Sequence, residues 1–332
     1  MRSNGHRRRT APRSQPSGLA ACEPLAPART GRALYDEVTA KIIGQLEAGC
    51  FPWVQPWGRP GVAGLGLPHN GATGRRYSGI NVLVLWGATF EHGYPSQGWL
   101  TFRQALAAGG AVRRGEKATK IVFADRFTPS KEKERAARDG DEPGTVAFLK
   151  EFPVFNLAQC EGLEHLAPQA APVPERQVAP GAEALIAATG ADFRIGGAKA
   201  YYVPSLDYIQ VPPQPAFNDQ INYYRTAFHE LSHWTGHPTR LARDQSGLHG
   251  APSYAREELV AEMGSAFVCA AMGIVPTVRH ADYLGSWLKV LREDSRAIFR
   301  AASQASKAAD LLLSYRPDAA SAPADAPEEA AA

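Results

Sequence analysis

The sequence has few cysteines, no long apolar stretch and no phosphate-binding loop, and these absences exclude several classes of protein. Its four cysteines are scattered and form no C-x-x-C pair, which argues against a structural zinc knot or a disulfide framework. No apolar run approaches the roughly 18 residues that span a membrane. The basic N-terminus is not followed by an apolar stretch, so we expect no secretory signal. There is no Walker A loop, no G-x-G-x-x-G and no helix-turn-helix pattern. We therefore predict a cytoplasmic protein that makes no membrane contact.

The charges are unevenly divided along the chain. Residues 1–160 hold 22 Lys and Arg against 13 Asp and Glu, whereas residues 161–332 hold 14 against 20. The first part is thus suited to a polyanion and the second is not, although ordinary solvated surface explains the same numbers.

Composition and periodicity predict an α+β protein with two folded parts between two polar tails. Residues 1–30 and 316–332 have almost no large apolar residues and are expected to be disordered. Alternating helical and strand-like patterns predict an α+β domain over 31–160, and a Pro- and Ala-rich linker over 161–180. The second domain, 181–315, is expected to hold short strands near 193–211 and helices over 219–235, 253–272 and 280–313.

The predicted helix over 219–235 carries the pattern H-E-x-x-H, as His229, Glu230 and His233. Residues i and i+4 share one helix face, so both imidazoles can reach one Zn²⁺ ion. Glu230 lies beside them, where it can take a proton from water that the metal activates. The uncharged neighbours suit a buried active-site helix, and the alternative is two core histidines on an amphipathic helix.

A catalytic zinc needs a third protein ligand, and several residues compete for that role. A metzincin pattern is excluded, because Thr239 stands where that pattern requires histidine. Glu262 is the first choice, since it lies in an apolar stretch where an unpaired carboxylate is costly. Glu258, one helical turn earlier, is second, and His237 is third because Gly236 and Pro238 break the helix around it. The sequence does not identify a transition-state stabiliser, and Tyr254 and His249 are only nearby candidates. Glu257 is expected to be an exposed helix charge.

Aromatic and basic residues interleave in the first domain, as they do in proteins that bind single-stranded DNA. Trp53 and Trp57 lie in a Pro-rich loop, where a core is seldom built, whereas Trp86 and Trp99 fit a core. The candidate DNA contacts are Trp53, Trp57, Arg75, Arg76, Tyr77, Asn81, Arg113, Arg114 and Lys117.

Several motifs together resemble one family, the ArdC antirestriction proteins, whose N-terminal region is shared with TraC-type plasmid primases. The resemblance covers roughly 31–315. In the first domain the matching motifs are Tyr35-Asp36-Glu37-Val38-Thr39, Tyr77-Ser78-Gly79-Ile80-Asn81, Trp99-Leu100-Thr101-Phe102 and Val112-Arg113-Arg114-Gly115-Glu116-Lys117. In the second they are His229 to His237, Glu257 to Phe267 and Ser286-Trp287-Leu288.

The resemblance implies a domain that binds single-stranded DNA, followed by a zincin-like metallopeptidase domain that binds Zn²⁺. It further implies a mobile-element protein, associated with plasmid conjugation, that shields incoming DNA from restriction. The protein or peptide substrate stays unknown. The alternative is a DNA-coating protein whose zinc site is structural and catalytically silent, and a third hypothesis is a general protease whose basic half docks on an acidic protein.

Overall fold

The computed structural model describes residues 31–54, 66–128, 132, 135, 136, 138, 146–166, 179–247, 251–276 and 283–316. The two predicted tails apart from Arg316, most of the predicted linker, Trp57 and His249 lie outside these residues. Within the described residues, no helix combines the length and the apolar character needed to cross a bilayer.

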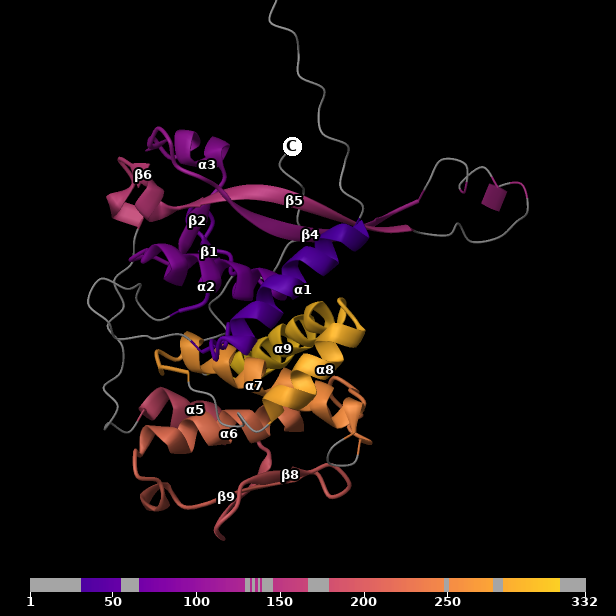
Figure 1. Cartoon of the computed structure of the whole chain (residues 1–332). Coiled ribbons are helices and arrows are strands. Elements are labelled where there is room, and N and C mark those ends of the chain that lie inside the picture. The colour runs from indigo at the N-terminus through magenta and orange to yellow at the C-terminus, as the bar shows by residue number, and fades with distance from the viewer. Residues whose placement is uncertain are drawn as a thin grey trace, which may run out of the picture.

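The N-terminal half combines two long helices with a mixed sheet (Figure 1). Its elements are α1 (Gly31–Glu47), β1 (His69–Asn70), α2 (Ile80–His92), β2 (Gly98–Leu100), α3 (Phe102–Ala107), β3 (Ala111–Val112), β4 (Thr119–Phe127), β5 (Val146–Asn156), η1 (Leu157–Gln159), β6 (Cys160–Glu161) and η2 (Glu164–Leu166). The sheet order is β1-β2-β5-β4, with β1 parallel to β2 and the other pairs antiparallel, and β3 pairs with β6. Asn81 fixes α2 to β4, because its amide exchanges two hydrogen bonds of 2.8 Å with the backbone of Val122.

The C-terminal half is mainly helical, with a small sheet at its lower edge in Figure 1. Its elements are α5 (Pro180–Ala188), β7 (Asp192–Ile195), β8 (Tyr201–Val203), β9 (Tyr208–Val211), η3 (Gln214–Ala216), α6 (Ile221–Trp234), α7 (Pro252–Ala271), α8 (Leu284–Glu293) and α9 (Ala297–Ser314). In the sheet, β9 lies between β7 and β8, so β8 is an edge strand.

The prediction of one helix over 280–313 is wrong, because the chain breaks between α8 and α9. Asp294 adopts an extended conformation (φ −148°, ψ 102°), and its carboxylate accepts a hydrogen bond of 2.9 Å from the backbone N–H of Arg296. Short acidic side chains that bond to nearby backbone in this way compete with helix hydrogen bonds. The α+β class itself is confirmed.

One hydrophobic core joins the two halves. Figure 1 shows α7, α8 and α9 as a middle layer, with the N-terminal elements on one side and α5, α6 and the small sheet on the other. Trp86 of α2 packs edge-on against Phe267 of α7, with ring centroids 5.6 Å apart. Trp53 packs in the same way against Trp287 of α8, also at 5.6 Å. The N-terminal half therefore rests directly on α7 and α8, and α7 packs in turn on α6, which carries the H-E-x-x-H motif.

Candidate metal centre

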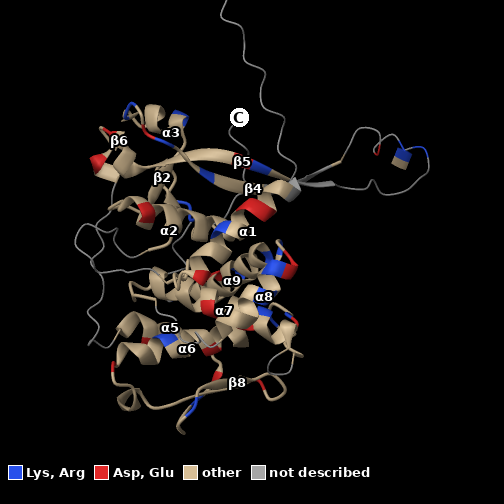
Figure 2. Cartoon of the chain, viewed as in Figure 1, with Lys and Arg blue, Asp and Glu red and all other residues tan. Residues whose placement is uncertain are grey.

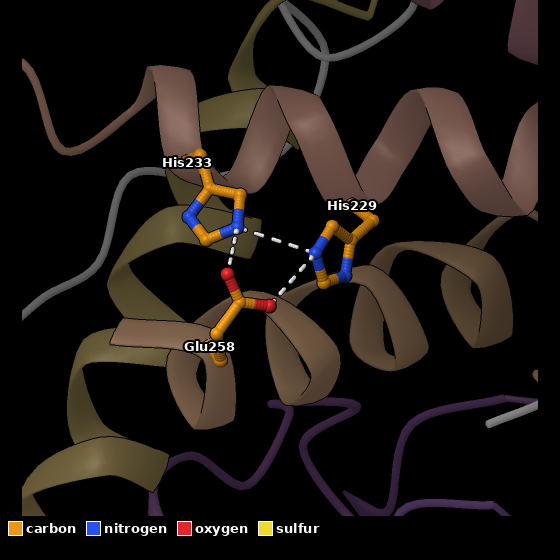
Figure 3. A group of neighbouring side chains, drawn as sticks. All are labelled: His229, His233 and Glu258. Atoms are coloured by element: carbon orange, nitrogen blue, oxygen red, sulfur yellow. Dashed lines mark hydrogen bonds and ion pairs between the residues drawn. The ribbon is translucent and has the colours of Figure 1, made fainter. Parts of the chain in front are cut away.

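The motif lies on α6, as predicted, and its two histidines point toward α7 (Figure 3). The two helices pack closely because Gly264 faces Ser232. A Cβ atom at position 264 would come within 2.8 Å of the Ser232 hydroxyl, closer than such contacts occur. This close approach brings the N-terminal part of α7, where the carboxylates lie, up to the two imidazoles.

Glu258 occupies the space between His229 and His233. The Nε2 atoms of the two histidines are 3.2 Å apart, and each lies 3.5 Å from one oxygen of the Glu258 carboxylate. Ligands of a tetrahedral zinc ion, with bonds of about 2.0–2.1 Å, stand about 3.3 Å from one another. The three side chains therefore have both the chemistry and the spacing of a zinc ligand set.

The structure places Glu262, our first choice as third ligand, behind this group instead. Its carboxylate lies 3.8 Å from Nδ1 of His229, on the ring nitrogen that is turned away from Glu258. Glu262 lies one helical turn, about 6 Å along α7, away from the space between the imidazoles. The α6–α7 packing puts the turn of Glu258 there. His237, which bonds to Thr239 at 2.8 Å, lies beyond the end of α6 and is not in the group.

Glu257, expected to be an exposed helix charge, is buried and holds His233 from behind. Its carboxylate lies 3.2 Å from Nδ1 of His233 and accepts hydrogen bonds from Arg243 (3.0 and 2.8 Å) and Gln245 (3.0 Å). Burial favours a raised pKa for Glu257, but the hydrogen bonds with His233 and Arg243 outweigh it and lower that pKa. An ionised carboxylate here fixes the tautomer and orientation of the imidazole, as in many zinc sites.

The ligand group favours a bound cation. Burial alone would lower the pKa of His233, but hydrogen bonds with Glu257 and Glu258 raise it to about 10. Burial likewise opposes ionisation of Glu258, yet hydrogen bonds with His229 and His233 lower its pKa. The carboxylates thus stabilise positive charge at this point, whether a proton or a metal ion supplies it.

The group opens onto a cleft of about 350 Å³. Glu230, Tyr254 and the edge strand β8 line this cleft together with the histidines. Burial, the hydrogen bond with Tyr283 and the charge of Glu258 raise the pKa of Tyr254, so its hydroxyl stays protonated and can donate near neutral pH. A general base and a hydrogen-bond donor therefore face the same cleft as the ligand group.

A salt bridge fixes the strand that borders the cleft. Asp207, in the turn between β8 and β9, binds Arg240, and Arg240 stacks on Trp234 with its guanidinium carbon 3.8 Å from the ring centroid. Asp207 also accepts a hydrogen bond from Tyr202. No sequence pattern predicts this salt bridge, because its partners are 33 residues apart and lie in irregular segments.

The predicted DNA contacts divide into buried and exposed residues. Trp53 is fully buried, which is incompatible with the stacking role predicted for it. The side-chain amide of Asn81 is hydrogen-bonded to the backbone of β4. Tyr77 is half-buried, and Arg113 bonds to backbone carbonyls of the segment around β6. The exposed members are Arg75, Arg76, Arg113, Arg114 and Lys117, of which Arg113 is held by these bonds.

Two histidines on one helix face a carboxylate from the next helix, and further buried carboxylates support the two imidazoles from behind. This arrangement defines a zincin-like metal site. Two family models agree with the architecture: an N-terminal domain of anti-restriction factor ArdC matches residues 32–155, and a zincin-like metallopeptidase matches residues 180–304. The chain belongs to the ArdC antirestriction family.

Individual relatives support this assignment. The antirestriction protein ArdC from plasmid R388 is 40% identical in its metal-free crystal structure, with a TM-score of 0.72 over 85% of this chain and 97% of that one. Its Mn(II)-bound structure is 39% identical and has a TM-score of 0.70, over 86% of this chain and 98% of that one. The uncharacterised protein y4eC of Sinorhizobium fredii is 38% identical over 88% of this chain and 95% of its own. A DNA primase TraC of Escherichia coli is 41% identical over 87% of this chain but only 28% of its own length, so primase activity does not carry over.

Proposed function

We propose that the chain is a metal-dependent peptidase that binds single-stranded DNA and protects the DNA of a mobile element in the cytoplasm. The observation that supports the peptidase is the set of three ligand side chains that open onto a cleft together with Glu230: the Nε2 atoms of the two histidines lie 3.2 Å apart, and each lies 3.5 Å from one of the two Glu258 carboxylate oxygens. His229, His233 and Glu258 would be the ligands. Zn²⁺ is the proposed metal, because two imidazoles and one glutamate are a known set for catalytic zinc. The related ArdC protein has an Mn(II)-bound structure, which supports a divalent ion in this chain.

The protein side chains would divide the chemistry of peptide hydrolysis among them. A bound divalent metal would supply a Lewis acid that makes water more acidic and polarises a carbonyl group. Glu230 would take the proton of the attacking water and pass it to the leaving amine nitrogen. Tyr254, which keeps its proton, would donate a hydrogen bond to the carbonyl oxygen as negative charge develops there.

The proposal of DNA binding is based on the family to which the chain belongs and on the surface charge of the N-terminal half. Arg75, Arg76, Arg114 and Lys117 are exposed there, and the matching family domain is that of an anti-restriction factor. Bound DNA would place the peptidase at the incoming strand, where proteins that act on that strand gather.

The proposed peptidase is tested on two substrates, casein and the protein's own chain. The zinc-loaded protein is incubated with casein or alone, in each case with and without single-stranded DNA. We expect cleavage that Glu230→Gln abolishes and that Glu293→Gln, an exposed carboxylate on α8, leaves unchanged. Loss of cleavage in Tyr254→Phe by about 100-fold is expected for a donor to the developing oxyanion. If neither substrate is cut although zinc and DNA are both bound, the alternative function is correct: the protein coats DNA, and its metal site is structural and not catalytic.

A further inference from the structure

A short helix at one end of the N-terminal half presents an apolar pair to solvent. Phe102 and Leu106 of α3 are each 52% exposed, and as residues i and i+4 they share one helix face. The helix itself is anchored, since Ala105, between them in sequence, is fully buried in a small core with Leu100 and Leu163. The exposed pair is therefore held rigidly in place and is not a frayed end.

The turn that carries Arg75 and Arg76 is tied to this helix. The Asn70 amide donates a hydrogen bond of 3.1 Å to the side chain of Gln104 in α3. The carboxamide oxygen of Asn70 accepts from the backbone of Ala72 and Thr73, at 3.0 and 3.1 Å, which fixes the turn itself. The two exposed arginines are thus connected to the apolar pair by a defined set of hydrogen bonds.

A second basic turn, with Arg114 and Lys117, reaches the same end of the molecule through β3, which packs on α3. Arg113 and Glu116 form an ion pair of 3.0 Å, and Gln159 bonds to Glu116 and to the backbone of Lys117. These bonds within the turn fix its shape, and the side chains of Arg114 and Lys117 remain exposed. Figure 2 shows Lys and Arg beside α3, with Asp and Glu gathered at β6.

We propose that this surface, which we call the α3 face, binds single-stranded nucleic acid with one base stacked on Phe102. The α3 face consists of Phe102, Leu106, Arg75, Arg76, Arg103, Arg114 and Lys117. Leu106 extends the apolar platform, and the cations on both flanks neutralise phosphates. This inference rests on the proposed DNA binding and names the residues that carry it out.

Two observations select a nucleic acid over other partners. Stacking platforms flanked by cations are the usual design of sites for single strands, because every base has a π-face and every link has a phosphate. Among the described side chains of the N-terminal half, Phe102 is the only Phe, Tyr or Trp that is exposed, and Trp53, Trp86 and Trp99 are buried. An acidic protein partner would use the cations but would have no need of the exposed ring.

The test measures binding of a fluorescent oligo-dT of about 20 nucleotides to the full chain, by anisotropy, at several salt concentrations. Phe102→Ala is expected to weaken binding about 5- to 150-fold, the equivalent of roughly 1–3 kcal/mol per stacked base. Phe102→Leu should weaken it as much, since leucine has no π-face, and Phe102→Tyr should bind like the parent. Arg103→Gln combined with Arg114→Gln should reduce the slope of log K against log salt by about 0.7 for each phosphate that is no longer neutralised.

Leu206→Ala provides the matched control, because Leu206 is 68% exposed but lies in the β8–β9 turn at the other end of the molecule. It is expected to leave DNA binding unchanged. The inference is overturned if the parent binds and Phe102→Ala binds equally well, or if Phe102→Leu keeps full affinity. A change in oligomeric state without a change in DNA affinity would assign the face to a second copy of the chain. If the parent itself binds no oligo-dT even at low salt, the proposed DNA binding fails, and this inference with it.

Discussion

Replacing Glu258 by glutamine should reduce metal affinity far more than the same change at Glu262. The substitution keeps the size of the side chain and removes the negative charge that faces both imidazoles at 3.5 Å. Four ligands together stabilise a structural zinc ion by about 10–16 kcal/mol, so one of them contributes roughly 3 kcal/mol. Glu258→Gln is therefore expected to weaken zinc binding about 100-fold or more.

Glu262→Gln is expected to weaken zinc binding about tenfold at most. Residues that support a ligand from behind typically contribute 10- to 100-fold in affinity. The carboxylate of Glu262 stands 3.8 Å from Nδ1 of His229, beyond good hydrogen-bonding distance, so its effect should fall at the low end.

Both affinities can be measured by competition with a chromophoric zinc chelator at pH 7, on the full metal-free chain. Circular dichroism of each variant checks that α6 and α7 are still folded. A larger decrease in affinity in Glu262→Gln than in Glu258→Gln would refute the ligand set derived from the structure and would restore the choice made from the sequence.

Three further changes test the surroundings of the site. Glu257→Gln should lower zinc affinity about 10- to 100-fold in the same competition assay, because His233 loses its orienting partner. Trp53→Ala should lower the free energy of unfolding by about 3–5 kcal/mol in urea, as expected for a core tryptophan, and should leave oligo-dT affinity unchanged. Asp207→Asn should destabilise the protein at neutral pH because it removes the ion pair with Arg240, while asparagine tolerates the positive φ of 50° at this position. Burial opposes ionisation of Asp207, but Arg240 and Tyr202 lower its pKa, so its contribution is present above the ordinary value of 3.8 and disappears as the pH falls through the lowered value. Urea titrations of the parent and of Asp207→Asn should therefore differ at pH 7 and converge at acid pH.

The metal-binding helix could be predicted because its information is local. Two histidines four residues apart face the same way on any helix, and uncharged neighbours indicate burial. Which glutamate faces both imidazoles depends on the register between α6 and α7, and the close packing of Gly264 on Ser232 helps to set that register. That register cannot be predicted from the positions of Glu258 and Glu262 in the sequence. The apolar neighbours of Glu262 correctly indicate that it is buried, but burial does not make it the residue between the imidazoles.

The exposure of the candidate DNA contacts was harder to predict for a related reason. Trp53 lies in a Pro-rich loop, and the loop composition favours an exposed ring. Its partner, Trp287, is more than 230 residues away on α8, so the packing that buries Trp53 cannot be read from its neighbours in sequence. Phe102, by contrast, follows the N-cap Thr101 of a short helix, and its aromatic character fits a core residue, although only Ala105 of that helix is buried.

The shared core limits how bound DNA could act on the proposed peptidase. Domains joined by small polar contacts move relative to one another, whereas a large apolar interface holds them fixed. Here Trp86 and Trp53 insert against α7 and α8, and the Thr39 hydroxyl and the Gly79 N–H donate hydrogen bonds of 2.6 and 2.8 Å to Ser295 and Ser306. A rotation of the two halves would have to break these contacts together. DNA bound to the N-terminal half would therefore act by bringing the cleft to its substrate, and any direct activation would have to pass through the middle-layer helices, of which α7 carries Glu258.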